Sequence, residues 1–383
     1  LWAGQGLQRQ PTGGNVMRAI GLLPAFTGNV GKPGAGFYYL NIWPALVGAD
    51  LDALAGAELA AGEVPKINHI GLAGELERHD RFRAFITWNT NPVASAAEQA
   101  RLRRALSRED LFTVVVDCFP TDTADYADIV LPAASFLEFD DLTFSYMNPM
   151  IGAQTRARAP IGEALPNTEI FRRLARAMGF EDKALFETDD ELIARLLAEM
   201  SVPISFGELS RVGHCFLSKE PLNFHEGLAF DTPSGKIEIA SDAAVAQGLS
   251  RLPTPEADPR PASGVFRLLS PASKWRLNDS YANDPTIAKR SGTASVTVHP
   301  DDAEAAGIVE GANVRLSNDA GSIELCAVIA ALAPRGVLLS HKGRWPKCED
   351  AGANVNVLHM ARSSDVAGCS AVHGTEVRLE VLP

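Results

Sequence analysis

The chain has 383 residues, 46% hydrophobic and 21% charged, a balance typical of globular proteins with a sizeable core. Its 47 acidic and 35 basic residues give a net charge of −12, which repels phosphate backbones and argues against a nucleic-acid partner. The sequence has no apolar run of the roughly 18 residues that a membrane span requires. The five cysteines form no CxxC pair, which argues against a local zinc or iron–sulfur site and fits a reducing compartment, so we expect a cytoplasmic protein.

The first eighty residues are rich in glycine, and we expect one helix there, over residues 16–23. Two nucleotide-binding patterns are incomplete in this region. Arg9 stands where the dinucleotide fingerprint beginning at Gly4 needs a glycine, and Pro33 stands where a P-loop ending in Gly31-Lys32 needs Ser or Thr. The sequence therefore does not favour a nicotinamide-dependent dehydrogenase.

The next segment has the pattern of a parallel sheet with a crossover helix. We expect a strand, a helix and two further strands over these residues: 84–88, 94–106, 112–116 and 128–131. Ligands of parallel sheets bind beyond the carboxyl ends of the strands. The polar residues at those ends are Asn89, Thr90 and Asn91 after the first strand and Asp117 after the second. We expect them to face one crevice.

Helices and irregular β structure are expected next. Residues 133–165 read as irregular β structure, and Asn167 or Thr168 is a candidate cap for the helix that follows. Thr188 and Glu191 form a capping box that starts a second helix. The apolar face predicted for that helix contains Leu192, Leu196 and Met200.

The last third of the chain is predicted to be a compact β-barrel. The proline-rich stretch 252–262 is the best linker candidate. Beyond it, short strands alternate with turns, and Pro300 starts a short helix that Gly307 stops. The predicted strands are 295–298, 313–317, 322–329 and 337–339.

Several motifs resemble those of the molybdopterin oxidoreductases of the dimethyl-sulfoxide-reductase and formate-dehydrogenase type. The longest is DCFPTDTADYADIVLP at 117–132, which resembles the family's strand, Asp, Thr-x-Thr-Ala turn and Ala-Asp-φ-φ-Leu-Pro pattern, where φ is hydrophobic. Shorter runs follow the family's order: TGNVGKPGAG at 27–36, Asn91-Pro92, TPSGKIE at 232–238 and HPDDA at 299–303. The resemblance covers nearly the whole chain.

The resemblance implies an α/β fold with parallel-sheet, dinucleotide-binding-like domains and a C-terminal β-barrel of the double-psi type. It divides the chain into the tail of one α/β domain (1–80), a second α/β domain (81–132), a mixed body with a linker (133–261) and the barrel (262–383). The implied cofactor is molybdopterin guanine dinucleotide carrying molybdenum or tungsten.

The resemblance also suggests which residues contact the cofactor. Asp117 would accept hydrogen bonds from guanine, and Thr121 and Thr123 would donate to ribose or phosphate. Backbone amides of 89–91 would bind a pyrophosphate. The remaining cofactor-binding candidates lie in the barrel: Ser273, Lys274, Arg276, Ser280, His341, Arg344 and Asn356. No catalytic residue or metal ligand is assigned.

The family's metal ligand, and any iron–sulfur cluster, belong to its first half, which this sequence does not match. The chain begins at Leu1 and not at Met, so we expect further sequence upstream, where an export signal would lie. The expected partners are that amino-terminal half or an electron-transfer protein, and a small-molecule redox substrate. Two interpretations remain open: a fragment that is inactive alone, and a non-catalytic nucleotide-binding or assembly module that works beside a separate amino-terminal chain. Apolar surface left by missing segments predicts self-association.

Overall fold

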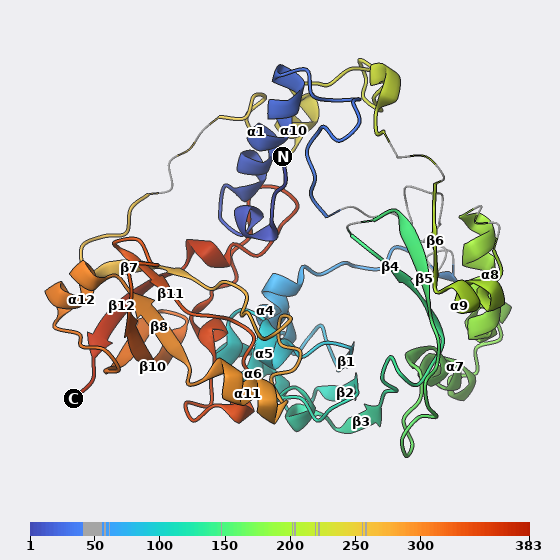
Figure 1. Cartoon of the computed structure of the whole chain (residues 1–383). Coiled ribbons are helices and arrows are strands. Elements are labelled where there is room, and N and C mark those ends of the chain that lie inside the picture. The colour runs from blue at the N-terminus through green and yellow to red at the C-terminus, as the bar shows by residue number, and fades with distance from the viewer. Residues whose placement is uncertain are drawn as a thin grey trace.

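Three β assemblies organise the part of the chain that the structure describes (Figure 1). The computed structural model describes residues 1–40, 56, 59, 60, 62–146, 148–200, 202, 204–218, 220, 223–254, 256 and 259–383. In Figure 1 the barrel lies at one end, an antiparallel sheet lies at the other, and a parallel sheet lies between them. Residues 255, 257 and 258 of the predicted linker fall outside the described residues.

The central sheet is parallel, as predicted, with strand order β1-β2-β3. Its strands are β1 (Ala84–Trp88), β2 (Phe112–Asp117) and β3 (Ile129–Pro132). The helices α4 (Leu72–Leu76), α5 (Pro92–Ser95) and α6 (Gln99–Leu106) cover one face through an apolar cluster that includes Val93, Leu102 and Leu111. The continuous β-branched run of β2 is buried because it is the central strand, with helices on one side and apolar contacts on the other.

The predicted single helix over 94–106 is wrong, because the chain breaks it into α5 and α6. The first helix ends at Ser95, and Glu98, the N-cap residue of α6, adopts a left-handed conformation with φ 52° before the second helix begins. Its backbone N–H donates to the carbonyl of His359 in the barrel, at 2.7 Å. The break between the two helices is therefore accompanied by a hydrogen bond to the barrel, which the local sequence does not predict.

The other face of the parallel sheet is only partly covered. Helix α7 (Asn167–Ala177) contacts it through Phe171, whose ring meets Trp88 edge-on at 5.1 Å between centroids. The helix begins after Pro166, and neither predicted cap residue makes a side-chain capping bond. Four apolar side chains on this face are 43–49% exposed: Ile86, Trp88, Phe112 and Ile129.

An antiparallel sheet carries its own helices. Its strands are β4 (Asp141–Phe144), β5 (Met150–Gln154) and β6 (His214–Phe216), and helices α8 (Asp189–Glu199) and α9 (Phe206–Val212) lie on it. The capping box of Thr188 and Glu191 is present, as predicted. Of the predicted apolar face, Met200 is buried, but Leu192 and Leu196 are only half-buried, because their neighbours Ile193 and Leu197 face the core instead.

The last third of the chain is a closed barrel, as predicted, with strand order β10-β8-β11-β7-β12-β9. The strands are β7 (Val265–Leu269), β8 (Ser295–Val298), β9 (Asn313–Asn318), β10 (Gly321–Ile329), β11 (Val337–Leu339) and β12 (Glu376–Val381). Alternate side chains fill its interior, including Leu268, Val296 and Leu316. Helix α11 (Pro285–Ser291) precedes β8, and α12 (Pro300–Ala306) starts and stops at the predicted residues.

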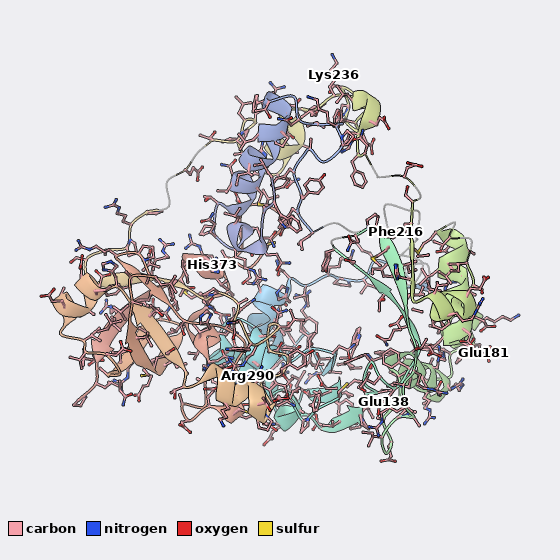
Figure 2. The ribbon with its side chains drawn as sticks, viewed as in Figure 1. Glu138, Glu181, Phe216, Lys236, Arg290 and His373 are labelled. Carbon is pink, nitrogen blue, oxygen red and sulfur yellow. The ribbon has the colours of Figure 1, made fainter. Side chains whose placement is uncertain are left out.

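The amino-terminal segment docks on the barrel. Helix α1 (Gly13–Phe26) is longer than predicted, and the backbone N–H groups of Gly14 and Asn15 donate to the carboxylate of Asp365. A Cβ on Gly14 would lie 2.2 Å from Val366, so this contact requires glycine. Figure 2 shows His373 between α1 and the barrel, where its backbone N–H donates to the carbonyl of Arg9.

Short helical segments connect these units. They are α10 (Asp242–Ala246) and the 3₁₀ turns η1 (Gln5–Gln8), η3 (His69–Gly71), η4 (Ala124–Tyr126), η5 (Lys183–Phe186), η6 (Glu226–Leu228), η7 (Pro346–Cys348), η8 (Val355–Leu358) and η9 (Val372–Gly374). No helix among the described residues is long and apolar enough to cross a membrane.

Candidate functional site

A cavity of about 560 Å³ lies where the carboxyl end of β1 meets the loops of the barrel; we call it the strand-end cavity. Its walls come from four parts of the chain: the amino-terminal segment, the η3–α4 segment, the loop and helix after β1, and the barrel. The predicted site residues that line it are Asn89, Thr90, Asn91, Ser280 and Asn356. The sequence-based expectation placed Asp117 in the same crevice as the β1 loop; the three residues of that loop line this cavity, and Asp117 does not.

Charged side chains from distant segments also meet at the strand-end cavity. Arg9 and Lys342 supply positive charge, and Asp279 supplies a carboxylate. Burial, and then the charge of Arg9, lower the pKa of Lys342. Burial raises the pKa of Asp279, and the nearby charges of Asp117 and Asp122 raise it further. The cavity thus joins two cationic groups and a carboxyl in one partly desolvated space, which suits a ligand with both anionic and hydrogen-bond-donating parts.

Buried amides fix the barrel against the helices beside the cavity. Asn354 and Asn356 both donate from Nδ2 to the carbonyl of Ala94, at 2.8 and 2.7 Å. Gln99 donates to the Oδ1 of Asn354 at 3.1 Å. Asn356 uses one N–H of its amide on Ala94 and still lines the cavity, so its carbonyl oxygen can accept a hydrogen bond from a ligand.

A second network ties the loop after β1 to the loop after β2. Asn91 Oδ1 accepts from both the N–H and the hydroxyl of Thr123, at 3.1 and 2.8 Å, and Asn91 Nδ2 donates to Asp122 at 3.0 Å. The Thr123 hydroxyl also accepts from the N–H of Val93. Thr123 is fully buried, so its hydroxyl positions Asn91 and is not presented to the cavity.

The barrel closes this network from the other side. Lys347 donates its backbone N–H to Asp122 at 2.7 Å and its ammonium to the carbonyls of Pro120 and Thr121 and to Asp125. Thr121 is buried, and its hydroxyl accepts from the N–H of Ala124. The Thr-x-Thr turn is therefore held internally and serves as a frame for the residues that do line the cavity.

Asp117 is half-buried at the carboxyl end of β2. Its carboxylate accepts the N–H of Phe119 at 3.1 Å, and burial raises its pKa. It is not among the residues that line the strand-end cavity, although its charge is felt by Asp279. The N–H of Asn89 is likewise already used, since it donates to the carbonyl of Val116.

A buried histidine supports the barrel wall. His359 Nε2 lies 2.9 Å from the hydroxyl of Ser270, and its Nδ1 lies 2.8 Å from the hydroxyl of Thr375. Burial, followed by the charge of His373, lowers the pKa of His359 to about 3, so the ring is neutral near pH 7. A neutral ring donates from one nitrogen and accepts at the other, which fixes the orientation of the Ser270 hydroxyl at the cavity wall.

The other five barrel candidates line a separate cavity of about 210 Å³, which we call the basic cavity. They are Ser273, Lys274, Arg276, His341 and Arg344. The two cavities share no lining residue, because neighbouring side chains of the same loop point to opposite sides: Lys342 lines the strand-end cavity, and Arg344 lines the basic cavity. The structure therefore separates a set of residues that the sequence grouped.

Sequence reasoning missed several residues of the strand-end cavity, above all Arg9, Asp279 and Lys342. Arg9 interrupts a glycine motif, and nothing in its sequence neighbourhood predicts a ligand contact. Lys342 and Asp279 are sequence neighbours of the predicted site residues His341 and Ser280. The sequence therefore predicts the correct loops, but not which of their side chains face the strand-end cavity. Glycine supplies one signal: Gly343 has φ 96°, and a Cβ there would lie 1.9 Å from the carbonyl oxygen of Asn278, so the two barrel loops touch at that point.

Two known family models match the chain segments on either side of the strand-end cavity. Residues 1–177 match the family model described as molybdopterin oxidoreductase, and residues 266–376 match the one described as Molydopterin dinucleotide binding domain. The chain belongs to the molybdopterin oxidoreductase family, and these domains imply a molybdopterin dinucleotide cofactor with molybdenum.

Curated relatives match the chain over almost its whole length. The probable oxidoreductase YoaE of Bacillus subtilis (strain 168) is 34% identical over 386 residues, covering 98% of this chain and 56% of that protein. Biotin sulfoxide reductase of Cereibacter sphaeroides is 29% identical, covering 98% of this chain and 57% of that protein. The chain thus spans about half the length of these relatives.

Among solved structures, acetylene hydratase from Pelobacter acetylenicus is similar in fold. It superposes with a TM-score of 0.69 at 20% identity, covering 81% of this chain and 46% of that chain. The predicted fold class, an α/β protein with a parallel sheet and a carboxy-terminal barrel, is confirmed.

Proposed function

We propose that this chain forms part of the binding site for molybdopterin guanine dinucleotide in an oxidoreductase that acts on a small-molecule substrate. The observation that carries the proposal is the strand-end cavity itself, built between the segments that the two family models match. Its volume of about 560 Å³ lies in the range of ligand-binding cavities. The length of the relatives that this chain does not match would supply the metal ligand.

The donors and acceptors of the cavity suit such a cofactor. Arg9 and Lys342 would hold the diphosphate through charge-assisted hydrogen bonds. Asn89, Thr90 and the carbonyl oxygen of Asn356 would pair with the polar edges of the pterin or the guanine. Asp279 would accept N–H groups of guanine, since it is the carboxylate that lines the cavity among the described residues. When bound, the cofactor supplies the two-electron redox chemistry of molybdenum or tungsten, while the chain binds and orients it.

Calorimetric titration with guanosine diphosphate tests the nucleotide half of the proposal on the purified chain. We expect saturable binding that Lys342→Met weakens at least tenfold, since a charged hydrogen bond contributes about 1.5–3 kcal/mol. Arg335→Met is the matched control, because Arg335 is an exposed barrel residue outside the cavity. Equal loss in both variants, or no binding at all, would contradict the proposal.

Turnover tests the other half. The chain alone should not turn over a redox substrate, and addition of a polypeptide equivalent to the unmatched length of a relative should be required. A purified sample of this chain that turned over substrate with stoichiometric molybdenum would show that the metal is held without that polypeptide.

A further inference from the structure

The basic cavity collects cationic side chains around a small space on the barrel. Lys274, Arg276, Arg290 and Arg344 all line it. Among the described residues, the one carboxylate that forms an ion pair with any of these four cations is Glu349, which accepts two hydrogen bonds of 3.0 Å from Arg344. Positive charge therefore exceeds negative charge at this place, although the whole chain carries a net charge of −12.

The burial and the unpaired Nε of Arg276 are the strongest indication of a ligand in the basic cavity. The residue is 6% exposed, and its Nε has no hydrogen-bond partner among the described residues. Burial, followed by the charge of Arg344, lowers the pKa of its guanidinium. Buried guanidinium groups are normally satisfied by carboxylates, carbonyls or anions, because an unpaired buried N–H costs about 1–3 kcal/mol or more. An anion in the cavity would supply the missing acceptor.

Two further cations are held beside Arg276 by one aromatic ring. Lys274 Nζ lies 5.0 Å and Arg290 Cζ lies 5.2 Å from the ring centroid of Trp275, both within cation–π range. Figure 2 shows Arg290 on α11, at the junction of the barrel and the parallel sheet. Both cations line the basic cavity, and among the described residues neither forms an ion pair with a carboxylate, so both are available to an anion there.

The size of the cavity limits the ligand. At about 210 Å³ it is less than half the size of the 560 Å³ strand-end cavity, which favours a small ligand such as one tetrahedral oxyanion. Ser273 adds a neutral donor, since its oxygen accepts the N–H of Trp275 and its hydroxyl hydrogen remains to donate. Guanidinium and ammonium groups match the geometry of phosphate-type oxygens.

We propose that the basic cavity is a binding site for a single phosphate-type oxyanion, separate from the strand-end cavity. The proposal does not rest on the function proposed above, since a free anion would bind to this chain whether or not a pterin does. It also differs from the sequence-based expectation that Lys274, Arg276 and Arg344 contact the dinucleotide. Inorganic phosphate and the phosphates of a nucleotide share this chemistry, so the experiment must distinguish these two sources.

Calorimetric titration of the whole chain with inorganic phosphate at low ionic strength tests the site. We expect one phosphate per chain, an affinity that falls as sodium chloride is added, and competition by sulfate. Arg276→Met should weaken binding at least tenfold, whereas Arg335→Met, which removes one arginine elsewhere on the barrel, should leave it unchanged. If circular dichroism shows that Arg276→Met does not fold, Arg290→Gln and Lys274→Gln, both at exposed side chains, carry the same expectation.

Three outcomes would overturn the proposal. The first is no phosphate binding to the wild-type chain at low ionic strength, and the second is equal weakening by Arg276→Met and Arg335→Met. The third is guanosine diphosphate that displaces phosphate and loses affinity in Arg276→Met, which would assign the basic cavity to the dinucleotide. Lys342→Met separates the two proposals, because it should weaken the nucleotide and leave inorganic phosphate unaffected.

Discussion

Replacement of Asn91 by alanine tests the network that joins the loops after β1 and β2. The amide of Asn91 is 3% exposed and makes three hydrogen bonds, two to Thr123 and one to the carboxylate of Asp122. Asn91→Ala leaves the N–H of Thr123 without a partner and removes a donor from a buried carboxylate. At about 1–3 kcal/mol for each buried group left unsatisfied, we expect the free energy of unfolding to fall by about 3–5 kcal/mol.

Urea denaturation followed by circular dichroism measures this loss. Thr123→Val removes one hydroxyl and should cost about 1–2 kcal/mol, and the double variant should cost less than the sum because the two side chains bond to each other. Asn283→Ala is the matched control, since Asn283 is exposed and should change stability by at most about 0.5 kcal/mol. A loss below about 1 kcal/mol in Asn91→Ala would refute the reasoning that this network holds the loops.

Three more predictions concern pH, backbone conformation and surface. The pKa of His359 is about 3 in the folded chain and about 6.5 in the unfolded chain, so as pH falls the unfolded state binds the proton first. The free energy of unfolding should therefore fall as pH drops from 6.5 toward 3, by up to about 1.4 kcal/mol per pH unit. The urea midpoint of His359→Gln should depend less on pH between 6.5 and 5, and an unchanged slope would contradict the assignment. Gly343→Ala should lower the melting temperature much more than Gly336→Ala, because both have positive φ but only at Gly343 would a Cβ meet backbone, 1.9 Å away. The chain alone should self-associate through the exposed sheet face, and Ile86→Thr with Phe112→Thr should reduce the mass seen by light scattering; a clean monomer at high concentration would count against it.

The sequence by itself determined the elements whose physical signals are local. Three such signals were predicted and are present: the β-branched run of β2, the capping box of α8, and the start and end of α12 at Pro300 and Gly307. Each depends only on residues that are neighbours in sequence. The Asp117 motif identified the family because a long run of fixed residue types rarely occurs by chance. These features need no knowledge of what lies beside them.

Only the tertiary structure decided which side chains share a cavity. The break at Glu98 accompanies a hydrogen bond to His359, more than 250 residues away in sequence, and Arg9 reaches the strand-end cavity because α1 docks on the barrel. Side-chain direction in a loop is set by packing and not by residue type, so His341 and Lys342 stand next to each other yet line different cavities. For the same reason Thr123, a candidate ligand by its motif, holds Asn91 instead.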